Sequence, residues 1–90
     1  MILHAEQIRA ARGLLGWSQV ELARRAGVAH MAVRRFESGN GPVSGKIASL
    51  VRVQDAFERV GVVFQPPDRE LGIGVRLRNQ CVRTARSPRK

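Results

Sequence analysis

SQVELARRAGVAHMAVRRFE, which spans residues 18–37, contains two short helical patterns separated by a glycine. Ser18 can cap the first helix, and Glu21 three residues later completes a capping box. Gly27 suits the tight turn that follows, because glycine tolerates a positive φ angle. The expected helices cover residues 18–25 and 30–38. This stretch therefore predicts two short helices joined by a tight turn.

Two further helices are expected on either side of this stretch. Before it, apolar residues recur at helical spacing between His4 and Leu15. After it, Ser44 is expected to cap the longest helix, which ends near Val60. The buried face of that last helix is predicted to consist of Ile47, Leu50, Phe57 and either Val53 or Gln54.

The pattern changes from helix to strand after Gly61. The run Val62–Phe64 is β-prone, and residues 75–78 alternate apolar and basic side chains with the period of a half-buried strand. We therefore expect a mainly α-helical fold with a small C-terminal β-hairpin. The predicted parts are a helical domain over 1–64, a hairpin extension over 62–78 that could mediate dimerisation, and a basic, disordered tail over 79–90.

The second of the two short helices, at residues 30–38, leaves one face without apolar side chains. Val33 and Phe36 point one way, and the other face carries two arginines that could enter the major groove of DNA. Here the sequence resembles the Cro and phage-repressor family of helix-turn-helix proteins, also called the xenobiotic-response-element family. The matching residues are Gln19, Leu22, Ala23, Gly27, Val28, Val33 and residues 36–39, and the resemblance covers about residues 6–64. It implies a lambda repressor-like bundle of four to five short helices and a role in transcriptional regulation.

The resemblance also implies a role for individual residues. Gln19 matches a residue that touches a phosphate and braces the groove contacts. The residues at base-reading positions are Ala29, His30, Met31 and Arg35. Arg34 matches a position near the groove wall, and Arg12 and Glu37 match an internal ion pair.

Lys46 adds to the predicted site, and Ala29 differs from the family at one of its positions. Lys46, expected at the start of the fourth helix, is predicted to contact phosphate. Ala29 departs from the family, which usually has Ser or Thr there. The alanine removes a side-chain cap worth about 1 kcal/mol and leaves only a methyl group for contact with thymine.

Charge and cysteine content narrow the class of partner. The chain has 16 lysines and arginines against 7 acidic residues, a net charge of +9, which favours a polyanion such as double-stranded DNA. The single cysteine, Cys81, cannot form an internal disulfide, and no segment has the pattern of a signal peptide or a membrane span. A cytoplasmic protein is expected. His4, His30 and Cys81 lack metal-ligand spacing, so neither a metal, a cofactor nor an enzymatic activity is predicted.

The sequence thus predicts a transcriptional regulator. Regulators of this kind most often act as repressors that cover the DNA site they bind. One alternative is an antitoxin that binds a toxin protein and represses its own promoter. Another is a protein-interaction module that has lost DNA binding. A role in RNA binding is less well supported, because the chain has few aromatic residues on which bases could stack. A homodimer is expected, joined through the strand Val75–Arg78, because an unpaired strand edge invites a second chain.

Overall fold

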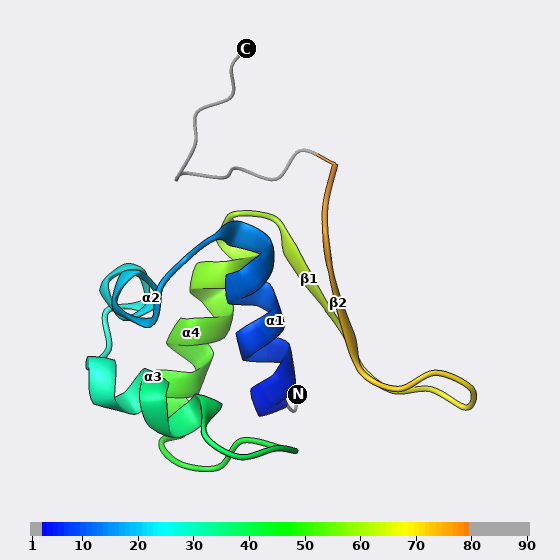
Figure 1. Ribbon diagram of the computed structural model, residues 1–90, viewed down its shortest axis with the longest axis horizontal. Coiled ribbons are helices and arrows are strands. Elements are labelled where there is room, and N and C mark those ends of the chain that lie inside the picture. The colour runs from blue at the N-terminus through cyan, green and yellow to red at the C-terminus, as the bar shows by residue number, and fades with distance from the viewer. Residues whose placement is uncertain (1–2, 80–90) are drawn as a thin grey trace.

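The computed structural model describes residues 3–79, and the predicted tail from residue 80 onward, with Cys81, lies outside the described residues. Four helices are followed by one antiparallel hairpin (Figure 1). Their bounds are α1 Ala5–Leu15, α2 Gln19–Ala26, α3 His30–Glu37, α4 Ile47–Arg59, β1 Val62–Gln65 and β2 Gly74–Leu77. In Figure 1, α2 and α3 lie on one side of α1 and α4, and the hairpin lies on the other. The mainly α-helical fold with a C-terminal hairpin is confirmed.

The turn between α2 and α3 forms as its residues predict. The Ser18 hydroxyl accepts a hydrogen bond from the Glu21 amide at 3.0 Å, and so caps α2. Gly27 ends the helix in the left-handed conformation, with φ of 70°, and its amide donates to the Ala23 carbonyl at 2.9 Å. The Glu21 carboxylate accepts hydrogen bonds from Arg24 and Arg25, which lower its pKa, and not from the Ser18 amide, so the predicted capping box forms only in part.

An aromatic cluster lies at the centre of the core. Trp17 stacks on Phe57 with ring centroids 5.6 Å apart, and Phe64 of the hairpin meets Phe57 edge-on at 5.8 Å. The Arg25 guanidinium covers the outer part of Trp17, 4.7 Å from the ring centroid. One cluster therefore connects α4, the hairpin and the loop before α2.

The start of α4 differs from the prediction. The helix begins at Ile47 rather than being capped by Ser44, and the residue at its N-cap is Lys46, which makes no side-chain cap. Gly45 has φ of 132°, which no helix can contain, and a Cβ there would lie 3.3 Å from the Phe36 ring. Because this positive φ at Gly45 interrupts the helical conformation beside Phe36, the helix starts later. Ile47 is 76% exposed, so its predicted burial was wrong, whereas Val53 and Phe57 are fully buried.

A buried glutamine attaches the hairpin to α1. The Gln7 side chain is 3% exposed, and its amide nitrogen donates to the carbonyls of Gln65 at 3.1 Å and Gly74 at 2.9 Å. These two residues are paired at the end of the antiparallel ladder next to the hairpin loop. The Gln7 oxygen in turn accepts from the His4 amide at 3.0 Å. Both ends of the amide are thus satisfied, which fixes where the hairpin meets the helices.

The loop between α3 and α4 is held by two side chains of α1. Arg9 donates to the carbonyls of Glu37 at 2.5 Å and Gly39 at 2.8 Å. The Glu6 carboxylate accepts from the Gly41 amide at 2.9 Å, and this bond lowers the pKa of Glu6. The loop therefore delivers the first residues of α4 to a fixed place beside α3.

Candidate nucleic-acid interface

Helix α3 presents one buried and one exposed face. Val33 and Phe36 are buried against the core, which leaves the opposite side of this helix in solvent. Met31 is 57% exposed. The exposed side chains of α3 are His30, Met31, Arg34 and Arg35. A helix with this division can approach a groove of DNA without losing its packing.

The N-terminal end of α3 has no side-chain cap. Ala29 lies at the N-cap position and makes no side-chain hydrogen bond, as its methyl group dictates. Further along the helix, the only side-chain hydrogen bond of Arg34 within residues 3–79 is a long contact of 4.0 Å with the Met31 sulfur. Arg34 is therefore available to other partners.

A buried carboxylate supports α3 from behind. The Glu37 side chain is 3% exposed, and its two oxygens accept from Arg12 Nε at 2.6 Å and Arg12 Nη2 at 2.8 Å. Arg12 also donates to the Trp17 carbonyl at 2.9 Å. The bidentate ion pair connects α1 to the end of α3, and the further bond of Arg12 reaches the loop between α1 and α2.

Gln19 extends this network to the exposed face. Its amide nitrogen donates to Glu37 Oε1 at 3.1 Å, and its amide oxygen lies 3.3 Å from His30 Nε2. The chain of contacts therefore runs from the buried ion pair through Gln19 to the first residue of α3. Gln19 is placed at the start of α2, beside the exposed face of α3.

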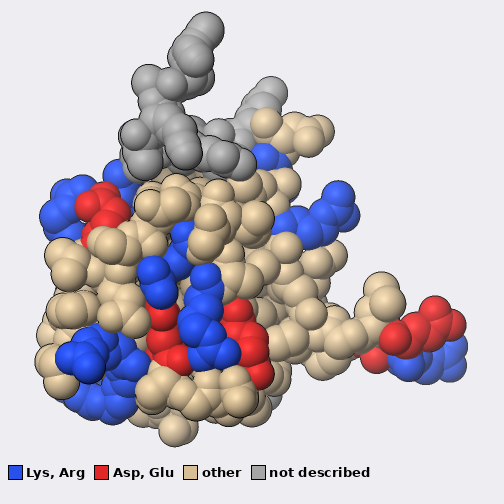
Figure 2. Space-filling view, viewed as in Figure 1, with Lys and Arg blue, Asp and Glu red and all other residues tan. Residues whose placement is uncertain are grey.

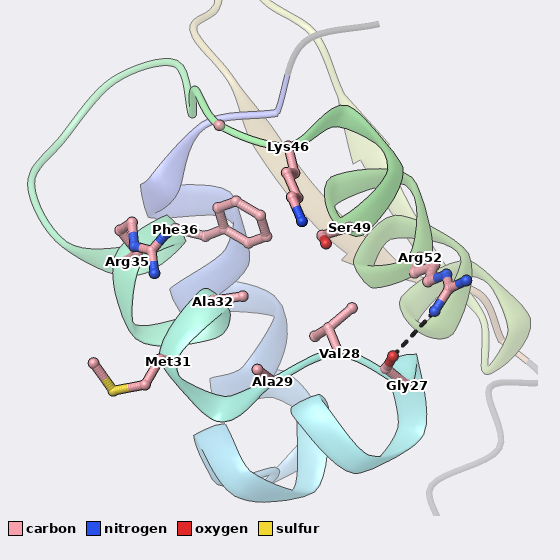
Figure 3. A pocket seen from close by; sticks show the side chains of 11 residues that line it. Gly27, Val28, Ala29, Met31, Ala32, Arg35, Phe36, Lys46, Ser49 and Arg52 are labelled. Atoms are coloured by element: carbon pink, nitrogen blue, oxygen red, sulfur yellow. Dashed lines mark hydrogen bonds between the residues drawn. The ribbon is translucent and has the colours of Figure 1, made fainter.

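A groove separates α3 from the start of α4 (Figure 3). Its volume is about 410 Å³. Three cationic side chains line it, namely Arg35 from α3, Lys46 at the start of α4 and Arg52 one and a half turns further along α4. Its floor includes Val28 and Phe36. An anionic chain that lay in this groove would meet cations on both walls.

Two residues of this groove were not predicted from the sequence. Arg52 donates to the Gly27 carbonyl at 3.2 Å, and so connects α4 to the turn between α2 and α3. Ser49 lines the same wall (Figure 3). Their helical spacing showed that they were not core residues, but nothing in the sequence indicated that this part of α4 faces α3.

The predicted site residues form two groups in space. Gln19 and His30 are joined by the contact described above, while Ala29, Met31, Arg35 and Lys46 border the groove. Arg34 lines neither feature. Figure 2 shows blue basic side chains over the side of the molecule that carries α2 and α3, some of them beside red acidic ones, and both signs of charge at the hairpin loop.

Neither a metal site nor a membrane-spanning helix is found within residues 3–79. No cluster of three histidine, cysteine or acidic residues in this part of the chain could hold a metal ion. None of the described helices combines the length and the apolar character that crossing a bilayer requires.

Comparison with known proteins identifies the segment that carries the interface. Residues 8–51, which contain α2, α3, most of α1 and the first turn of α4, match the model of a family described as helix-turn-helix. No curated protein matches the chain. The predicted resemblance to helix-turn-helix proteins of the xenobiotic-response-element type, which include Cro and the phage repressors, is therefore confirmed over these residues.

Proposed function

We propose that this protein is a sequence-specific repressor that binds double-stranded DNA and acts by occupying its operator. The observation that carries the proposal is the exposed face of α3, supported from behind by the buried Arg12–Glu37 pair and flanked by a groove with three cations. Residues 29–35 would read base edges in the major groove. Gln19, Lys46 and Arg52 would contact phosphates, which provide affinity and register but little sequence information.

Salt dependence tests the electrostatic part of this proposal. The affinity for DNA should fall steeply as salt rises, because each phosphate neutralised by the protein releases counterions. Replacing Lys46 with alanine should reduce the slope of log affinity against log salt by about 1. Titrations at several salt concentrations, on a site selected from a random DNA pool, provide the measurement.

Arg69 offers a matched control for Lys46. It is exposed in the hairpin loop, on the other side of α1 and α4 from α3 (Figure 1), so Arg69→Ala removes one positive charge and should leave the slope unchanged. A slope near zero for the parent protein would contradict the phosphate contacts. Absence of binding to any DNA at low salt would favour a protein-interaction module instead.

The proposed repressor acts as a homodimer joined through β2. One domain of this size reads few base pairs, and two copies on a symmetric site supply the missing specificity. Within residues 3–79, the sheet has only the strands β1 and β2. The Arg78 amide donates to the Gly61 carbonyl, so by alternation the peptide groups of Val75 and Leu77 point away from β1. These groups could pair with β2 of a second copy.

Charge selects one register for that pairing. A symmetric antiparallel pair would bring Val75 to Val75, Val75 to Leu77, or Leu77 to Leu77 of the partner copy. The second and third arrangements place Arg76 directly opposite Arg76 or Arg78, and like charges in that position are destabilising. The first places Arg76 opposite Gly74. We therefore favour the register centred on Val75.

Two substitutions test this dimer by sedimentation at several protein concentrations. Val75→Pro removes an outward-pointing amide that the hairpin does not use, so it should yield monomers while the circular dichroism stays native. Arg76→Glu should change the dimerisation constant little, because its neighbour in the partner is a glycine. Tighter dimerisation of Arg76→Glu would indicate pairing of Arg76 with Arg78, and dimerisation of Val75→Pro at the parent's strength would overturn the strand-mediated interface.

A further inference from the structure

The hydrogen bonds behind α3 connect Glu37 to Gln19 and Gln19 to His30. Which group donates and which accepts in each bond bears on how His30 reads DNA. We infer that Glu37, acting through Gln19, holds neutral His30 with its proton on Nε2 and leaves Nδ1 as a hydrogen-bond acceptor for a base. This inference rests on the proposed function, since it concerns which base the helix selects. It follows from three contacts, taken in order from the buried end.

The first step is the orientation of the Gln19 amide. Glu37 is a carboxylate paired with Arg12, and a carboxylate can only accept hydrogen bonds. The atom of Gln19 that lies 3.1 Å from Glu37 Oε1 must therefore be the amide nitrogen. The amide oxygen then points the other way, toward His30.

The second step is the state of the His30 ring. The Gln19 oxygen can only accept, and it lies 3.3 Å from His30 Nε2, so Nε2 must carry a hydrogen. In neutral imidazole one nitrogen donates and the other accepts. His30 Nδ1 has no hydrogen-bond partner within residues 3–79, and His30 is exposed. The network therefore leaves an unused acceptor on the first residue of α3.

The third step connects this acceptor to base identity. In the major groove, adenine N6 and cytosine N4 present hydrogen-bond donors, whereas guanine N7 and O6 present only acceptors. Neutral His30 would thus favour adenine or cytosine and disfavour guanine. When the ring gains a proton, Nδ1 becomes a donor, and guanine becomes the better partner. The charged groups on the three helices around His30 are Glu6, Arg9 and Arg12 of α1, Glu21, Arg24 and Arg25 of α2, and Arg34, Arg35 and Glu37 of α3.

The tautomer can be measured in the free protein, without DNA. Nitrogen-15 NMR of the imidazole rings distinguishes a protonated from an unprotonated ring nitrogen, and the spectrum of His30→Gln separates His30 from His4. Above the range of about pH 5 to 8 in which histidines change charge, the parent should show His30 protonated on Nε2. Gln19→Leu, which removes the acceptor, should raise the population protonated on Nδ1. A parent protein with the proton on Nδ1 would overturn the inference.

The effect on DNA is measured at the base pair that His30 contacts, located as the position where His30→Ala relaxes selectivity. At a pH at which the nitrogen-15 spectra show His30 neutral, the parent should bind the adenine or cytosine version about tenfold more tightly than the guanine version. At a pH at which the same spectra show the ring protonated on both nitrogens, this ratio should fall to about one or invert. His30→Gln has no titrating group at this position, so its ratio should be the same at both pH values.

The outcomes separate this inference from the proposed function. A parent ratio that does not change with pH, in a protein that still binds its site, would overturn the reading role of His30 and leave DNA binding intact. Loss of the pH effect in His30→Gln, together with a smaller pH effect in Gln19→Leu than in the parent, would support the path through Gln19. If the protein bound no DNA, the proposed function would be wrong. The NMR measurement on the free protein would still test which nitrogen of His30 carries the proton.

Discussion

Replacing Arg12 with leucine should lower the free energy of unfolding by about 3–5 kcal/mol. The substitution leaves the Glu37 carboxylate buried, with its side chain 3% exposed, and removes the two bonds of 2.6 and 2.8 Å that compensate its charge. The remaining side-chain partner, Gln19, is neutral and makes one bond. Urea unfolding followed by circular dichroism measures the loss, which would be a large share of the stability of a domain this small.

Arg24 provides the matched control, since it also pairs with a glutamate. Its side chain is 67% exposed, so Arg24→Leu should cost only about 0–1 kcal/mol. The double variant Arg12→Leu with Glu37→Leu should recover much of the lost stability, because no unpaired charge then remains in the core. Equal effects of Arg12→Leu and Arg24→Leu would contradict the description of Glu37 as a buried charge that needs its partner.

The second large effect is expected at Arg35, and it concerns DNA selection. Arg35→Ala should weaken binding to the preferred site by about 1–3 kcal/mol, or about 5- to 150-fold, and should relax the choice at one base pair. The reason is that arginine makes paired hydrogen bonds to guanine N7 and O6. Binding is measured on the preferred site and on each of its single-base variants at fixed salt.

Lys46→Ala is the comparison variant, because it also removes one positive charge from the groove. It should weaken binding to all sequences about equally, as loss of a phosphate contact does. Arg35 and Lys46 line opposite walls of the same groove, so the two roles can be separated only by this pattern of selectivity. A uniform loss for Arg35→Ala would make Arg35 a phosphate contact and pass base reading to His30, Met31 or Arg34.

Local features could be predicted from the sequence wherever a single residue determines the backbone conformation. Ser18 and Gly27 fix the ends of α2 through a hydroxyl acceptor and a positive φ, and both are read from the sequence. The strand pattern of residues 75–78 was readable for a similar reason, since its period of two differs from that of a helix. The predicted start of α4 was wrong because Ser44 is a good cap only if the next residues can be helical, and Gly45 is held at a positive φ beside Phe36.

The sequence by itself determined that two short helices, a tight turn and an exposed basic helix face would form, because these depend on neighbours within a few residues. Only the tertiary structure decided which distant residues meet. Gln19 contacts Glu37 and His30, Arg52 contacts Gly27, and Gln7 holds the hairpin. Each of these contacts joins different helices, turns or strands, so it depends on how the helices and hairpin pack. A hydrogen bond also requires atoms within about 3 Å, which helical periodicity alone cannot specify.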